Sequence, residues 1–142
     1  MKKILKYVGI GLVAIFILIQ FVPYGHQHTN PAVVSEPNWD SPQTRELAKR
    51  ACFDCHSNET TWPWYSNIAP ISWQIQIDVD YGRRALNFSN WARAREVNEI
   101  PFAVQRGFMP PSNYLLTHPQ AKLTQAEKDA LVAGLQATIK NP

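Results

Sequence analysis

Apolar stretches and helical periodicities organise this chain, and the longest apolar stretch comes first. Residues 7–22 are uncharged and rich in Ile, Leu, Val and Phe, and the charged residues before them are Lys2, Lys3 and Lys6. This length is close to the roughly 20 residues that a helix needs to cross a bilayer. A cleavable signal peptide is the alternative, but bulky residues end the stretch and do not suit the peptidase. We therefore predict an uncleaved transmembrane helix over residues 1–22.

Two further segments follow this expected anchor. Residues 23–40 contain several prolines among polar and small residues with no period, which predicts a linker. His26 and His28 lie in it, and we expect them to be solvated rather than bound to metal. Residues 41–142 predict a small domain, which the lysines before the span would place on the outer side of the membrane.

The pattern in this domain predicts an all-α fold with long loops. Helices are expected over residues 41–51, 71–88 and 91–100, followed by a last helix. Ser41 and Pro42 suit the cap and first position of the first of these. β-branched residues leave a short strand possible within 71–88. Thr124 and Glu127 form a capping box at the start of the last helix.

Composition and charge change this picture only slightly. The formal net charge of +3 comes partly from the lysines before the apolar stretch, so it does not argue for a nucleic-acid partner. Eleven prolines and an 11% share of aromatic residues indicate irregular structure packed around a flat group.

The strongest chemical signal is the run Cys52-Phe53-Asp54-Cys55-His56, which matches C-x-x-C-H, the attachment motif of covalent haem c. Two thiols about one helical turn apart can add across the two vinyl groups of one porphyrin, and the adjacent imidazole can reach the iron. A Cys52–Cys55 disulfide, a zinc half-site and a thioredoxin-like redox pair are the alternatives. The motif therefore predicts one covalently bound haem c with His56 as an iron ligand.

The second axial ligand would decide whether the haem transfers electrons or binds an exchangeable ligand. Met109 lies in Gly107-Phe108-Met109-Pro110-Pro111, a proline-flanked loop after the motif and before the last helix, as in small cytochromes c. We therefore predict that Met109 is the second metal ligand. His118 and an open or water-bound face are the alternatives.

Further residues could contact the porphyrin. Arg83 could pair with the propionates, because a guanidinium binds carboxylates well. Trp64 could pack against the ring. The other aromatic candidates are Trp62, Tyr65, Trp73 and Trp91.

These motifs together give the chain a family resemblance. The haem motif is followed by Trp62-Pro63-Trp64-Tyr65, Gly82-Arg83, Leu86-Asn87-Phe88-Ser89 and Gly107-x-Met109-Pro110-Pro111, with Tyr114 and His118 further on. Over residues 30–139 the chain resembles the bacterial haem-binding domain family, whose members are small and usually membrane-anchored. The resemblance implies haem binding through Cys52, Cys55 and His56 and a cytochrome c-like helical fold.

The combined expectation is a monohaem c-type cytochrome, single-pass in a bacterial inner membrane through residues 7–22, with its domain in the periplasm. It would be an electron carrier rather than an enzyme, with an unidentified redox partner protein. The alternatives are a gas or redox sensor or a weak peroxidase with an exchangeable sixth ligand, and a thiol domain closed by a disulfide.

Overall fold

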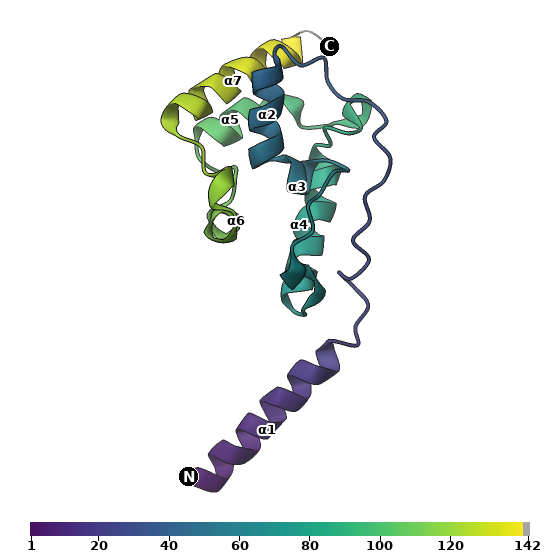
Figure 1. The fold of residues 1–142 in the computed structure, drawn as a ribbon, viewed down its shortest axis with the longest axis vertical. Coiled ribbons are helices and arrows are strands. Elements are labelled where there is room, and N and C mark those ends of the chain that lie inside the picture. Colours follow the sequence, from purple (N-terminus) through teal and green to yellow (C-terminus); the bar gives the residue numbers. More distant parts are fainter. Residues whose placement is uncertain (141–142) are drawn as a thin grey trace. The chain divides into compact units, whose positions relative to one another are not determined.

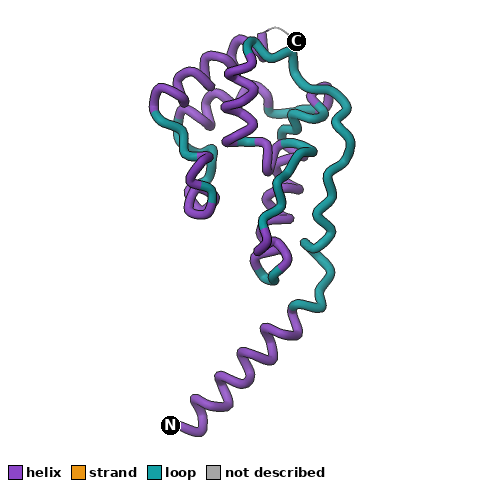
Figure 2. The backbone as a smooth tube through the Cα atoms, in the orientation of Figure 1, coloured by secondary structure: helices purple, strands orange, loops and turns teal. Residues whose placement is uncertain are grey.

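The computed structural model describes residues 1–140 and divides the chain into two compact units. One unit comprises residues 1–29 and 62–78, and the other comprises residues 30–61 and those from 79 onward. Within residues 1–140 the regular backbone is helical, with no strand (Figure 2). This agrees with the all-α class predicted from the sequence.

The first unit contains α1 (Lys2–Ile19), the 3-10 turn η1 (Trp64–Asn67) and the start of α4 (Ile71–Ala85). The Gln20 side chain, just after α1, accepts the Ala69 N–H at 2.9 Å and donates to the Ala69 carbonyl at 3.0 Å. The ring of His28 stacks on Trp62 at 4.7 Å. His28 is therefore held by packing, whereas we had predicted a solvated histidine in a linker.

The predicted membrane anchor is wrong. No helix within residues 1–140 has both the length and the apolar character needed to cross a membrane. The helix α1 includes all three lysines and ends at Ile19 rather than Val22. Its uncharged part, residues 7–19, rises about 20 Å at 1.5 Å per residue, against a hydrocarbon core of about 30 Å. The single-pass location deduced from this anchor is wrong as well.

The second unit holds the remaining helices. These are α2 (Pro42–Ala51), α3 (Phe53–His56), α5 (Ile100–Gln105), α6 (Ser112–Thr117) and α7 (Gln125–Lys140), together with the C-terminal end of α4. Short 3-10 turns, η2 to η4, lie at Trp91–Arg93, Val97–Glu99 and Pro119–Ala121. The helices α5 and α2 both pack against α7 (Figure 1). This packing forms the frame to which the haem motif is attached.

The two predicted helix starts are confirmed with their caps. The Ser41 Oγ accepts the Thr44 N–H at 3.2 Å at the start of α2. At the start of α7, the Thr124 Oγ1 accepts the Glu127 N–H at 3.3 Å and the Glu127 carboxylate accepts the Thr124 N–H at 2.7 Å. Local side-chain chemistry therefore sets where these two helices begin.

The predicted helix over residues 91–100 is wrong. Two 3-10 turns occupy this stretch, and α5 begins only at Ile100. The N–H groups of Arg95 and Glu96 both donate to the carbonyl of Ala85, at 3.2 Å each, at the end of α4. Because these donors serve α4, they are not available for a continuous helix through the segment. The expected helix over 71–88 does form, and it ends at Ala85.

The core of the second unit is apolar and rich in aromatic rings. Its buried residues are Leu47, Ala48, Ala51, Phe53, Leu86, Phe88, Ile100, Val104, Leu123, Leu131 and Leu135. Trp39, in the expected linker, packs against it, with its ring 5.2 Å from that of Phe88. The predicted domain boundaries stay a prediction, although residues 30–40 of the expected linker belong to the second unit.

Candidate functional site

The haem motif lies where α2 ends and α3 begins. The Cys52 N–H donates to the Ala48 carbonyl at 2.8 Å and so completes α2, while the Cys52 carbonyl accepts the His56 N–H at 2.9 Å and opens α3. Phe53, only 2% exposed, anchors this corner in the core. Both cysteines are half-buried and carry thiols. The motif is therefore presented by two short helical turns fixed to the core.

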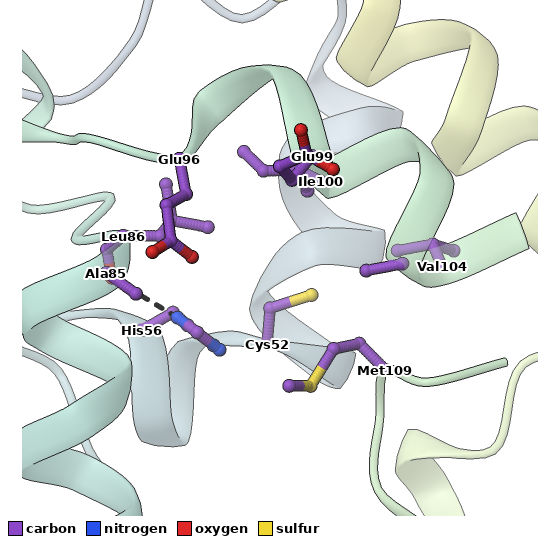
Figure 3. A pocket seen from close by; sticks show the side chains of 10 residues that line it. Cys52, His56, Ala85, Leu86, Glu96, Glu99, Ile100, Val104 and Met109 are labelled. Carbon is purple, nitrogen blue, oxygen red and sulfur yellow. Dashed lines mark hydrogen bonds between the residues drawn. The ribbon is translucent and has the colours of Figure 1, made fainter. Parts of the chain in front are cut away.

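His56 is oriented by the backbone of α4 and the residues that follow it. Its Nδ1 lies 3.1 Å from the Gly82 carbonyl. The same atom lies 3.2 Å from the Leu86 carbonyl (Figure 3). Because only an N–H can donate to these carbonyls, the neutral ring carries its proton on Nδ1 and its lone pair on Nε2. Burial lowers the pKa of His56, although the two carbonyls and the carboxylate of Glu96 oppose this. A neutral imidazole with an available Nε2 is the form that binds a metal.

Gly82 allows α4 to approach the haem motif closely. A Cβ at this position would clash with the carbonyl of Cys55. Only glycine therefore brings the Gly82 carbonyl within hydrogen-bonding distance of His56 without displacing the motif.

We expect Gly82→Ala to destabilise the second unit by about 2 kcal/mol or more, because the added methyl overpacks a backbone contact. The melting temperature should fall by roughly 10 °C. Gly11→Ala is the matched control, since a Cβ there meets open space on α1. Melting temperatures are measured by circular dichroism. If the two variants melt at the same temperature, the close contact between Gly82 and the haem motif does not require glycine.

A pocket of about 490 Å³, counted with the solvent in its open mouth, lies over this corner. The residues that line it are Cys52, His56, Ala85, Leu86, Glu96, Glu99, Ile100, Ala103, Val104 and Met109. Figure 3 shows the imidazole of His56 and the sulfur-bearing chains of Cys52 and Met109 around the same space.

Met109 reaches the pocket on a turn that follows α5. Gly107 has a φ of +74°, a left-handed conformation that reverses the chain there. The N–H groups of Phe108 and Met109 then donate to the Ala103 carbonyl at 2.9 and 3.2 Å. Met109 keeps 37% of its surface exposed, so it forms part of the pocket rim.

The other predicted site residues lie outside this lining. The Nδ1 of His118 lies 3.1 Å from the Tyr114 carbonyl. The guanidinium of Arg83 donates to the Ser57 carbonyl at 2.7 Å and to the Thr60 hydroxyl at 3.0 Å. Trp64 belongs to the first unit and is 75% exposed. Cys55 is not among the lining residues, although it follows Cys52 by one turn.

Sequence reasoning missed several residues of the pocket. Ile100 and Val104 form the buried apolar wall from α5, and their four-residue spacing was a usable signal. Glu96 and Glu99 contribute carboxylates, which carry no periodic or motif signal in the sequence. Their position depends on how the segment after α4 folds back.

The site fits a haem group. Apolar side chains would cover a flat hydrophobic ring, an oriented imidazole offers nitrogen, and a thioether and a thiol line the same space. This all-helical fold and donor set define a haem-protein class.

A family model described as haem-binding domain matches residues 14–137, and the chain belongs to that family. Neither a curated protein nor a solved structure matches the chain. The family resemblance is thus confirmed as far as haem binding, and the protein is a haem-binding protein.

Proposed function

We propose that this protein is a monohaem c-type cytochrome that transfers electrons to and from an unidentified redox partner protein. Cys52 and Cys55 would hold the haem covalently, and His56 and Met109 would be its axial ligands. The observation that carries the proposal is that His56 and Met109, which are far apart in the sequence, line one pocket together with Cys52. When bound, haem supplies an iron that alternates between the ferric and ferrous states.

The two cysteines would act as nucleophiles toward the vinyl groups. Each thiol would supply the sulfur of one carbon–sulfur bond and the proton that its vinyl group takes up, so no electrons would be gained or lost overall. Burial, with a smaller contribution from Cys55, raises the pKa of Cys52 to about 12. The Cys52 side chain is therefore a protonated thiol at neutral pH and supplies both the sulfur and the proton.

The two proposed axial ligands are both neutral. His56 offers Nε2 because its Nδ1 proton faces backbone carbonyls. Met109 offers a thioether, a soft ligand that favours the ferrous state over harder ligands. A neutral ligand pair that stays in place on reduction keeps the structural change small, as electron transfer requires.

The peroxidase alternative finds less support. Such an enzyme would use an arginine and a histidine over an open iron face, and Arg106 with His118 is a candidate pair late in the chain. In the described residues neither belongs to the pocket lining, and the guanidinium of Arg106 lies 5.3 Å from the centre of the Phe102 ring. Met109 occupies the rim instead.

The test is an absorption spectrum of the protein produced together with haem-attachment machinery. We expect one haem per chain that stays attached during denaturing electrophoresis, sharp bands on reduction, and a weak far-red band on oxidation. That band marks sulfur ligation of ferric iron. Haem that is extracted by acidified solvent would contradict covalent attachment. Rapid carbon monoxide binding to the reduced protein, without a far-red band, would support an exchangeable face.

A further inference from the structure

Asp54, one of the two residues between the cysteines of the motif, bonds to a nearby loop and to a segment far along the chain, both in the second unit. Its Oδ1 accepts the Thr61 N–H at 2.9 Å. Its Oδ2 accepts the hydroxyl of Tyr114 at 2.6 Å, a short distance typical of a hydroxyl donating to an ionised carboxylate. The second bond joins the haem motif directly to α6.

Tyr114 follows Met109 closely in the chain. Pro110 and Pro111 lie between the methionine and α6, and they restrict the backbone of the connection. A contact that fixes Tyr114 therefore also limits where Met109 can lie. Upstream, the Ala103 carbonyl fixes the same loop through the N–H of Met109 at 3.2 Å. The loop is thus attached on both sides, to α5 before Met109 and to the haem motif after it.

The surroundings of Tyr114 hold its hydroxyl in place. Its ring stacks on the imidazole of His118, with centroids 4.0 Å apart and an interplanar angle of 10°. The Tyr114 carbonyl accepts the His118 N–H at 3.1 Å, which closes the segment around the stack. Burial and the adjacent Asp54 raise the pKa of Tyr114, so its hydroxyl remains a donor throughout the neutral range.

We propose that Tyr114 is a positioning residue, which fixes the Met109 loop to the haem motif through its hydrogen bond to Asp54. This inference rests on the proposed function, because it concerns Met109 as an iron ligand. A thioether is a weak ligand, and it stays bound to ferrous iron only if its loop is held near the metal. The bond to Asp54 provides this restraint from the same turn that carries Cys52 and Cys55.

The test uses the haem-loaded protein and Tyr114→Phe, which removes the hydroxyl and keeps the ring that stacks on His118. We expect a weaker far-red band and carbon monoxide binding to the reduced protein that is tighter on the order of tenfold, the effect of losing one charge-assisted hydrogen bond. Haem content should stay unchanged. The matched control is Tyr81→Phe, because Tyr81 is an exposed tyrosine on α4. A structural effect alone would lower the melting temperature without changing carbon monoxide affinity.

The outcomes separate the two proposals. A native protein with no far-red band overturns both, because Met109 is then not a ligand. A native protein with the band and a Tyr114→Phe variant with unchanged band and carbon monoxide affinity overturns the positioning role alone. If Tyr114→Phe does not load haem, Asp54→Asn replaces it. The amide oxygen can keep the Thr61 N–H while the amide NH2 faces the Tyr114 oxygen, so the charge-assisted bond is lost and a neutral one can take its place. Asp54→Asn should then raise carbon monoxide affinity by a smaller factor, and an unchanged affinity would overturn the inference.

Discussion

Replacing Cys52 and Cys55 together by alanine is expected to remove covalent haem and to leave the second unit poorly folded. The first effect follows from the chemistry, because thioether bonds need the two sulfurs. The second follows from size, since roughly 100 residues with many prolines bury a limited core. Phe53 lies between the cysteines in that core, and the pocket wall beside them is apolar. Covering that wall with a porphyrin contributes several kcal/mol by area, in the range of about 25 cal/mol per Å².

Two measurements check this expectation. Haem stain on a denaturing gel should be absent from the double variant, and thermal unfolding followed by circular dichroism should begin at a lower temperature and lose cooperativity. Asn113→Ala with Gln120→Ala is a matched double control, because both side chains are exposed. A protease-resistant double variant with native helix content would refute the folding argument. Haem that stayed attached through denaturation would refute the attachment itself.

Replacing Met109 by alanine is expected to leave haem attached and to change the iron. The thioethers and His56 are untouched, so loading should stay at one haem per chain. Without the sulfur ligand the ferric iron should become high-spin or take up water, and the far-red band should disappear. The reduction potential should fall by on the order of 0.1 V, since axial ligands set haem potentials over a wide range.

His118→Ala is the comparison that decides between the two candidate ligands. The His118 imidazole stacks on Tyr114 at 4.0 Å and lies outside the pocket lining. We expect its loss to leave the far-red band in place and the spin state unchanged. If the His118 variant loses its sixth ligand and the Met109 variant does not, the iron has two histidine ligands. If neither variant changes the spectrum, the sixth site is open, and a sensor or peroxidase role gains support.

Local signals predicted the local structure of this chain well. Ser41 with Pro42, and Thr124 with Glu127, mark the starts of α2 and α7, because capping depends on residues only three positions apart. The all-helical class followed from periodicity in the same way. The predicted anchor was wrong because the apolar stretch continues to Val22, whereas α1 itself ends at Ile19 and includes the lysines. Composition alone does not predict where a helix ends when no capping residue marks that end.

In the candidate site too, the sequence predicted some features correctly and others not. The C-x-x-C-H motif identified haem as the cofactor, and the family match supports haem binding. Arg83 looked suitable for a propionate by its charge, but its guanidinium bonds to Ser57 and Thr60, which pairwise chemistry alone could not indicate. The helix expected over residues 91–100 was wrong because the Ala85 carbonyl accepts two of its N–H groups. That contact also carries Glu96 toward the pocket.

The sequence by itself determined the helical class, the two capped helices and the identity of the cofactor, because each depends on residues close together in the chain. It predicted Met109 as the second iron ligand and kept His118 and an open face as alternatives. Only the tertiary structure shows that Met109 lines the same pocket as His56, that the carbonyls of Gly82 in α4 and of Leu86 after it orient His56, and that Tyr114 bonds to Asp54. The physical reason is that these contacts join distant segments. Such contacts depend on how α5, α6 and the end of α4 pack, and no local pattern encodes that packing.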